Sequence, residues 1–205
     1  MPDFSFELAA MAQGATRIAG VDEVGRGPLA GPVLAAAVVL NPDAIPAGLA
    51  DSKKLTARRR DALAPLIRQN ADWGIGIVDV AEIDRINILQ ASLRAMELAI
   101  AALGTPPDFA LIDGNRVPPG LTCPAQEVVK GDDRSASIAA ASILAKVSRD
   151  AIMRDLAARF PGYGWETNAG YGTKAHLAAL DRLGVTPEHR VSFKPIHNIL
   201  YQEKK

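Results

Sequence analysis

Cysteine is almost absent from this chain of 205 residues, which contains only Cys123. A single cysteine excludes an internal disulfide and any all-cysteine metal site. Long apolar runs are lacking too, because the segments Pro32–Leu40 and Ala136–Ala145 are too short or too interrupted by polar residues to cross a bilayer. The first residues, Met1–Phe4, lack the basic start and the apolar stretch of a signal peptide. These absences predict a cytoplasmic protein that does not bind membranes.

Neither sign of charge is in excess, since the chain has 23 lysines and arginines and 23 aspartates and glutamates, which gives a formal net charge of zero. The chain therefore lacks the overall basic character that often marks nucleic-acid binders. Basic residues are still grouped locally, within Asp51–Arg60 and again from Lys130 to Arg154. Each group predicts either a positive surface patch or an ordinary solvated helix face.

Hydrophobic residues make up 48% of the chain, which is enough to bury a core as one domain over residues 1–205. Their spacing predicts strands first, then strands and helices in turn, and this order favours an α/β fold around one mixed sheet. We expect strands at 17–24, 32–40, 72–80 and 109–112, and a strand that ends near 128–129. We expect helices at 56–70, 81–103, 135–159 and 173–183, with an irregular loop at 160–171.

Two adjacent acids, Asp22 and Glu23, end the first predicted strand, just before Val24–Pro28. Carboxylates inside an otherwise apolar strand are costly unless a cation compensates them. Asp113 ends another buried strand in the same way, and Asp132 precedes an apolar helix. Because strand ends converge on one edge of a sheet, the four acids predict an oxygen-only site for Mg²⁺ or Mn²⁺. Two such ions about 3.5 to 4 Å apart would activate a water and stabilise the leaving oxygen of a phosphodiester.

Two of the four acids are also typical of simple structural roles. Asp113 precedes a glycine and could form a turn, while Asp132 could cap a helix. The neighbouring Asp133 competes with Asp132 for the role of fourth ligand. The sequence does not indicate which of the two metals is preferred.

The segment Asp22–Gly31 resembles the signature of type 2 ribonuclease H, also called ribonuclease HII. The resemblance continues in order over about residues 17–197, through the blocks Asp51–Leu55, Ile112–Gly114, Lys130–Asp132, Ala139–Val147, Gly170–Thr173 and His189–Phe193. Departures are modest. Val24 stands where alanine is more usual, and Asp133 makes the fourth acidic position ambiguous by one residue. Register against the block Ala139–Val147 favours Asp132.

The resemblance implies a ribonuclease H-like fold, in which helices flank a mixed five-stranded sheet and a small helical C-terminal portion from about residue 160 binds substrate. It implies an endonuclease that hydrolyses the RNA strand of RNA/DNA hybrids and incises 5′ to single ribonucleotides in duplex DNA. We expect the protein to be a monomer, although the sequence does not reveal the oligomeric state. The products would carry 3′-hydroxyl and 5′-phosphate ends, and the role would be ribonucleotide excision repair and RNA primer removal. The catalytic carboxylates, which also bind the metal ions, would be Asp22, Glu23, Asp113 and Asp132.

Selectivity for RNA is implied for Gly25, Arg26 and Gly27, which would contact the 2′-hydroxyl of a ribonucleotide. Glycines on both sides of Arg26 let the backbone approach a sugar closely, and the 2′-hydroxyl is the group that distinguishes RNA from DNA. Tyr171 would stack on the following deoxyribose. A plain tight turn at the glycines, a surface ion pair of Arg26 and a packed ring of Tyr171 are the alternatives.

Phosphate contacts are predicted for four further residues. Lys53 and Lys54 would bind phosphates, with Ser52 donating a hydrogen bond beside them. Lys146 would reach the scissile or a neighbouring phosphate, although its helix could equally expose it to solvent. The three histidines of the chain invite acid–base roles, but metal ions generate the nucleophile without them, so structural or substrate-rim roles are favoured.

Three other functions compete with this hypothesis. Gly25–Ala30 fits the pattern Gly-x-Gly-x-x-Ala, with Asp43 about 20 residues further on, as dinucleotide-binding units require. There the glycines should open a helix, whereas Val33–Leu40 is typical of a strand. A non-catalytic hybrid-binding module would not need four carboxylates. A type 3 relative usually carries an extra N-terminal domain, whereas this chain reaches its first catalytic strand by residue 17. No clamp-binding segment is evident near the C-terminus.

Overall fold

A five-stranded sheet forms the centre of the computed structural model, which describes residues 1–201. The strands are β1 (Ile18–Val24), β2 (Val33–Leu40), β3 (Ala71–Val78), β4 (Phe109–Asp113) and β5 (Ala125–Val128). Their order is β3-β2-β1-β4-β5, with β1 antiparallel to β2 but parallel to β4. This mixed sheet confirms the predicted architecture. Only the last residues of the predicted domain, 202–205, lie outside the described part of the chain.

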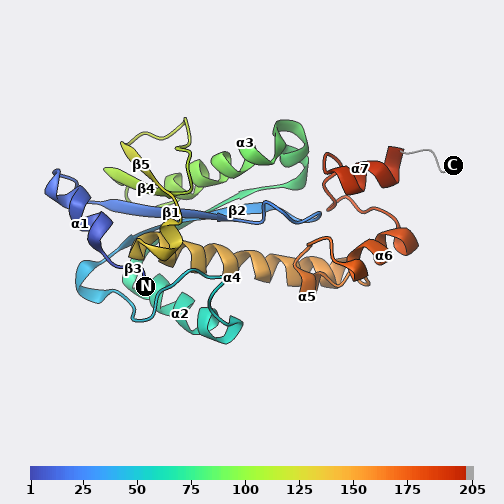
Figure 1. Cartoon of the computed structure of the whole chain (residues 1–205), viewed down its shortest axis with the longest axis horizontal. Coiled ribbons are helices and arrows are strands. Elements are labelled where there is room, and N and C mark those ends of the chain that lie inside the picture. Colours follow the sequence, from blue (N-terminus) through green and yellow to red (C-terminus); the bar gives the residue numbers. More distant parts are fainter. Residues whose placement is uncertain (202–205) are drawn as a thin grey trace.

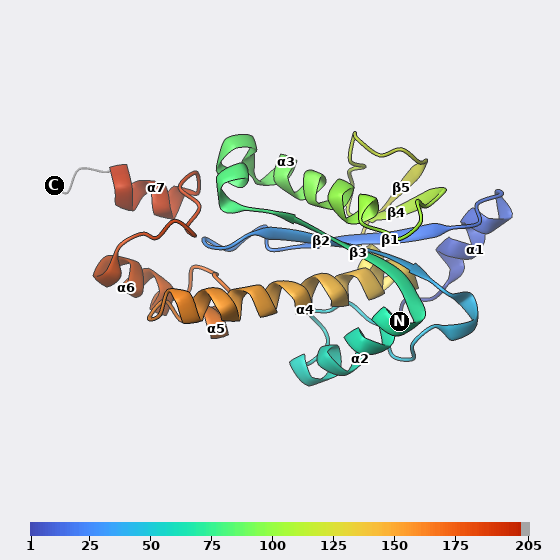
Figure 2. The ribbon, with the colours of Figure 1, turned by 180° about the vertical axis from the view of Figure 1, so that it is seen from behind.

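Helices cover both faces of the sheet (Figures 1 and 2). Helix α3 (Val80–Ala101) lies on one face, and α2 (Ala57–Asn70) and α4 (Ala136–Arg159) lie on the other. Two glycines bring these layers close. A Cβ on Gly76 of β3 would lie 2.0 Å from a carbonyl oxygen of α3, and a Cβ on Gly20 of β1 would lie 2.2 Å from the carbonyl carbon of Ser137 in α4.

Three helices begin directly after a residue whose side chain caps the first turn, and the sequence indicates each of these capping residues. Thr56, Ser135 and Thr173 each accept a hydrogen bond from the backbone N–H three residues later, at the starts of α2, α4 and α6 (Lys174–Leu183). The predicted helix 81–103 is not continuous, however. Asn87 lies at φ 70° and ψ 162° inside α3 and accepts hydrogen bonds from the amides of Leu89 and Gln90, so it begins a second helical segment.

The C-terminal portion packs at one end of the long helix α4 (Figure 1). It contains α5 (Trp165–Asn168), α6 and α7 (Lys194–Tyr201). The prediction of an irregular loop at 160–171 was wrong over α5, a four-residue helix whose flanking residues Gly164 and Ala169 both have left-handed backbones. Neither α7 nor the N-terminal helix α1 (Ser5–Ala12) was predicted.

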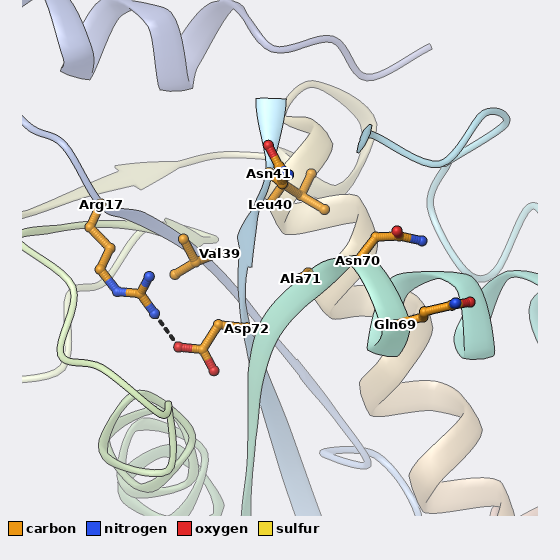
Figure 3. Close-up of a pocket in the computed structure, with 8 residues that line it drawn as sticks. All are labelled: Arg17, Val39, Leu40, Asn41, Gln69, Asn70, Ala71 and Asp72. Carbon is orange, nitrogen blue, oxygen red and sulfur yellow. Dashed lines mark hydrogen bonds and ion pairs between the residues drawn. The ribbon is translucent and has the colours of Figure 1, made fainter. Parts of the chain in front are cut away.

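A hollow lies at the end of the sheet where β1 begins (Figure 3). Arg17 donates across it to Asp72 of β3, and Asp72 also accepts from the amide of Gly104 after α3. The first residues of β1, the end of β2 and the start of β3 meet here. The hollow lies at the start of β1, whereas Asp22 and Glu23 lie near its other end.

The helices within residues 1–201 are all too short or too polar to cross a membrane.

Candidate active site

Asp22 and Asp113 lie side by side because their strands are parallel and in register. Val21 pairs with Ile112, so the next residue on each strand is an aspartate. Side chains alternate along a strand, and both aspartates point to the face that α4 covers, where Gly20 and Leu111 also point. Strand pairing alone therefore places the two carboxylates together.

Asp132 joins them from the short 3-10 helix η2 (Gly131–Asp133) that precedes α4. Carboxylate oxygens of Asp22, Asp113 and Asp132 all lie within 4.8 Å of one another. The amide of Gly131 donates to Asp113 at 2.6 Å, which holds the turn against β4. Asp133 points elsewhere and accepts from Lys54 at 2.6 Å. The geometry therefore favours Asp132 over Asp133 as the partner of the two strand-end acids.

Glu23 lies on the opposite face of β1, as the alternation of a strand requires. It lines a small pocket together with Asp113 and residues of α3, and its carboxylate accepts from Arg26 at 3.2 Å. It is not part of the close trio of acids. A further acid that was not predicted, Asp51, is buried and lies beside Asp132 and Asp133. The sequence feature that could have indicated Asp51 as a site residue is its position in the family block Asp51–Leu55.

Burial and mutual repulsion disturb the ionisation of these acids. Burial, and then the charges of Glu23 and Asp113, raise the pKa of Asp22 well above its usual range. Burial and the charge of Asp113 raise the pKa of Asp132 to about 6. Burial also raises the pKa of Glu23, although Arg26 works in the opposite direction. The site thus holds more negative potential than its surroundings neutralise.

These residues fit a hard divalent cation. The converging donors are all carboxylate oxygens, the donor type that Mg²⁺ and Mn²⁺ prefer and that is atypical of zinc. A bound cation would also relieve the repulsion that raises the pKa of Asp22 and Asp132. Asp132 has a positive neighbour in Lys53, whose Nζ lies 3.7 Å from the Asp132 carboxylate, but the Lys53 side chain is 77% exposed.

The predicted phosphate contacts lie at the rim of this site or beneath it. Lys53 and Lys54 are exposed, and each forms an ion pair with an acid of η2. Ser52 is buried, and its hydroxyl lies 2.8 Å from the hydroxyl of Ser142. Lys146 follows Ser142 by one helical turn and donates to Asp150 at 2.7 Å. Their roles in binding phosphate stay predictions.

Gly25, Arg26 and Gly27 form a turn next to Tyr171, in which Gly25 is buried while Arg26 and Gly27 are exposed. The backbone of Gly25 has φ +94°, which favours glycine, and a Cβ on Gly27 would lie 3.3 Å from the ring of Tyr171. The Tyr171 side chain is 47% exposed, so the ring is available for stacking. The structure therefore brings together the two elements that the sequence predicted for contact with a sugar.

Two buried arginines that were not predicted as site residues hold this turn. Arg190 makes five hydrogen bonds of 2.7–3.1 Å to the carbonyl oxygens of Gly25, Arg26, Pro28 and Gly31. Arg149 donates to the carbonyl oxygens of Ala30, Pro32 and Ala169. Arg149 thereby connects the segment that follows the turn to the loop that carries Tyr171. The sequence feature that could have indicated them is position: Arg190 lies inside the block His189–Phe193, and Arg149 follows shortly after the block Ala139–Val147.

A buried histidine pair holds the backbone of Tyr171 from the other side. His176 Nδ1 lies 2.9 Å from the Tyr171 carbonyl oxygen, and its Nε2 accepts from Trp165 and lies 3.1 Å from His189 Nε2. His189 Nδ1 accepts from the amide of Thr186. Each ring nitrogen has a matching partner only when both rings are neutral. The network thus supports the predicted structural role of these histidines.

Acid should weaken this network and lower the stability of the protein. Burial, and then His176, lower the pKa of His189 from 6.5 to about 4, so the folded state binds fewer protons than the unfolded chain between these values. The stability contribution is complete above pH 6.5 and is lost as the pH falls toward 4, by about 3 kcal/mol. Chemical denaturation of the metal-free protein at a series of pH values measures it.

The difference between wild type and His189→Gln isolates the histidine from the acids that titrate nearby. We expect this difference to shrink as the pH falls from 6.5 to 4. His197→Gln, on the exposed surface of α7, is the matched control and should follow wild type at every pH. A constant difference between wild type and His189→Gln would contradict the assignment.

Solved structures place this fold and site among the ribonucleases H. The ribonuclease H2 of Pyrococcus horikoshii OT3 is similar with a TM-score of 0.74 and 25% identity, over 90% of this chain and 97% of that one. The RNase HII of Archaeoglobus fulgidus, solved in a complex with PCNA, is similar with a TM-score of 0.69 and 26% identity, over 87% and 96% of the two chains. The fold and the cluster of acids thus define a nuclease of the ribonuclease H class.

Sequence comparison narrows the class to one family. The model of the family described as Ribonuclease HII matches residues 19–196. The Ribonuclease HII of Ruegeria pomeroyi is 65% identical over 98% of this chain and 86% of that one, and the Ribonuclease HII of Paracoccus denitrificans is 61% identical over 99% and 97%. The chain belongs to the ribonuclease HII family, which confirms the resemblance. It is a metal-dependent ribonuclease H, an endonuclease of RNA/DNA hybrids.

Proposed function

We propose that this chain also incises duplex DNA on the 5′ side of a single embedded ribonucleotide, and leaves 3′-hydroxyl and 5′-phosphate ends. The observation that carries this proposal is the position of the turn Gly25–Gly27. It directly follows Asp22 and Glu23 on β1 and lies against the exposed ring of Tyr171. A nuclease that selects ribonucleotides needs a group that contacts the 2′-hydroxyl close to its catalytic acids.

Asp22, Glu23, Asp113 and Asp132 would hold two divalent ions, Mg²⁺ or Mn²⁺. When bound, such ions supply an activated water and stabilise the departing 3′-oxygen. The support in this chain is the all-carboxylate donor set, in which Asp22 and Asp132 are buried, and the raised pKa of these two acids. A protein of the same fold at 20% identity, Bst-RNase HIII, was solved in complex with Mn²⁺.

The chain's own residues would orient the cleaved strand. In the proposal, the backbone of Gly25 and Gly27 and the side chain of Arg26 contact the 2′-hydroxyl, and the ring of Tyr171 stacks on the next sugar. Arg190 supports this assignment, because it holds the carbonyl oxygens of Gly25 and Arg26, and that of Pro28 just after the turn, in fixed positions before substrate arrives.

Phosphates would be bound by Lys53 and Lys54, with Ser52 donating a hydrogen bond beside them and Lys146 further along α4. The exposure of both lysines next to the acids supports this role. We further propose that the enzyme acts as a monomer in the cytoplasm, in ribonucleotide excision repair and the removal of RNA primers.

A duplex that carries one ribonucleotide tests the proposed activity. With Mg²⁺ or Mn²⁺ the enzyme should cut once, on the 5′ side of the ribonucleotide, and it should cut neither without metal nor in an all-DNA duplex. Mapping both fragments by denaturing gel and mass spectrometry identifies the bond that is broken and the chemistry of the ends. A cut on the 3′ side, or no metal-dependent cut, would refute the proposal.

Tyr171→Ala should reduce cleavage at a single ribonucleotide more than cleavage of a long hybrid. Loss of one stacking contact costs about 2 kcal/mol, roughly 30-fold. A long hybrid offers many alternative registers and should lose only a few-fold. The measurement is kcat/KM on both substrates. Tyr171→Phe keeps the ring and should preserve the ratio between them, whereas equal losses in Tyr171→Ala would exclude stacking at the junction.

A further inference from the structure

Glu7 is a fully buried acid in α1 that lies outside all the family blocks. Its Oε1 accepts hydrogen bonds from the hydroxyl of Ser135 at 2.6 Å and from the amide of Ser137 at 2.9 Å, and the Ser137 hydroxyl donates to it as well. Its Oε2 is the one buried side-chain polar atom within residues 1–201 that has no hydrogen-bond partner. Burying an acid lowers the stability of the fold unless its contacts compensate, so the contacts of Glu7 with Ser135 and Ser137 require an explanation.

These contacts complete the capping of α4, the helix that follows Asp132. The first amides of an α-helix have no partner within the helix. Here the amide of Ala136 donates to the carbonyl oxygen of Asp3, that of Ser137 donates to Glu7, and that of Ile138 donates to the Ser135 hydroxyl. The N-terminal segment of the chain thus provides two of the three acceptors (Figure 1 shows α1 near the start of α4).

Ser135 connects the capped start of α4 to the turn that carries Asp132. The amide of Ser135 donates to the carbonyl oxygen of Gly131 at 2.8 Å, and the amide of Gly131 donates to Asp113 at 2.6 Å. The turn is therefore held between β4 on one side and the capped start of α4 on the other. The hydroxyl of Ser135 is in turn held by Glu7.

The start of α4 also lies directly on the strand that carries Asp22. The contact between Gly20 and the backbone of Ser137 leaves no room for a side chain. Glu7 accepts from the Ser137 amide and so holds the first turn of α4 in place against β1. The position of that turn determines the distance between Asp132, which precedes α4, and Asp22 on β1. We propose that Glu7 is a positioning residue that fixes Asp132 for metal binding, acting through Ser135 and Ser137.

The inference rests on the proposed role of Asp132 as a metal ligand, and metal binding without substrate tests it. Glu7→Gln keeps the shape of the side chain but places an NH₂ group where no acceptor is available. We expect Mn²⁺ affinity, measured by calorimetry on the free protein, to fall about 10-fold, as for other groups that orient metal ligands. Cleavage of a long hybrid should need correspondingly more Mn²⁺, with kcat largely recovered at saturation.

Amide hydrogen exchange gives a readout that does not involve metal. In metal-free Glu7→Gln, the amides of residues 131–138 should exchange faster than in wild type, while those of α3 should be unchanged. Ser137→Ala removes one of the three hydrogen bonds and should produce smaller changes of the same kind. This variant keeps the inference testable if Glu7→Gln fails to fold.

Met11→Ala is the matched control, because Met11 is on the same helix as Glu7 and packs against an apolar cluster that includes Ile138 of α4, without a polar contact to α4. It should lower the melting temperature with unchanged Mn²⁺ affinity. Glu7 would have only a structural role if Glu7→Gln lost stability while Mn²⁺ affinity and exchange at 131–138 stayed as in wild type. A wild-type protein that binds Mn²⁺ but does not cut at ribonucleotides would refute the proposed function and leave this inference standing.

Discussion

Asp22→Asn and Asp113→Asn are each expected to lower kcat for hybrid cleavage by about 10³-fold, roughly 4 kcal/mol of transition-state stabilisation. Each substitution removes one charged oxygen from a trio whose members lie within 4.8 Å of one another. An amide is a poor ligand for a hard cation, and the two remaining acids provide too little charge to replace it. Rates are measured at saturating Mg²⁺ on a uniform RNA/DNA hybrid.

The free energy of unfolding of Asp22→Asn should rise, although its activity falls. Burial and like charges raise the pKa of Asp22, so its ionised form is unfavourable in the metal-free folded state. Asp22→Asn removes that charge and should raise the free energy of unfolding by about 1 kcal/mol without metal. Inactivity combined with higher stability would separate loss of metal binding from loss of the fold.

Asp43→Asn is the control for these variants, since Asp43 is an exposed acid in a short 3-10 helix after β2. It should keep wild-type activity, and it also removes the acid that a dinucleotide-binding unit would require. Asp132→Asn and Asp133→Asn, compared in the same assay, identify the fourth ligand. Only the first should impair cleavage severely. Full activity in both Asp22→Asn and Asp113→Asn would show that the metal site lies elsewhere.

Arg190→Met is expected to destabilise the protein by on the order of 5 kcal/mol, since four backbone carbonyl oxygens would lose their buried donor. For a chain of this size that corresponds to a fall of roughly 15 °C in melting temperature. The methionine fills similar space but donates no hydrogen bond. Differential scanning calorimetry measures the change.

Arg182→Met, on the exposed side of α6, should change the free energy of unfolding by less than about 0.5 kcal/mol. Arg190→Lys should recover only part of the loss, because one ammonium group cannot reach acceptors on both sides of the turn. If Arg190→Met melted within a few degrees of wild type, the turn Gly25–Gly27 would be held mainly by other contacts.

The sheet and its main helices could be predicted because their signals are local. Strand residues alternate or form short apolar runs, and Thr56, Ser135 and Thr173 begin the helices where the sequence indicates. The meeting of Asp22 with Asp113 was also predictable, since both acids end buried strands and such ends converge at a sheet edge.

The features that could not be predicted depend on contacts between distant segments. Glu7 lies 128 residues from Ser135 in sequence, and Arg190 lies 165 residues from Gly25. Nothing in the local pattern around either residue indicates a buried partner. The break at Asn87 is similar, because an uninterrupted apolar spacing continues through a residue whose backbone is not helical.

The registry of β1 on β4 makes the enzyme sensitive to insertions and deletions in a way that point substitutions do not reveal. Adding one residue between Ile18 and Val21 would place Val21 instead of Asp22 opposite Asp113 and turn Asp22 toward α3, because side chains alternate between the two faces. The same shift would bring a side chain in place of Gly20 against the start of α4. We therefore expect length variation among functional sequences to be excluded from β1 and confined to the loops, such as 41–51 and 114–124.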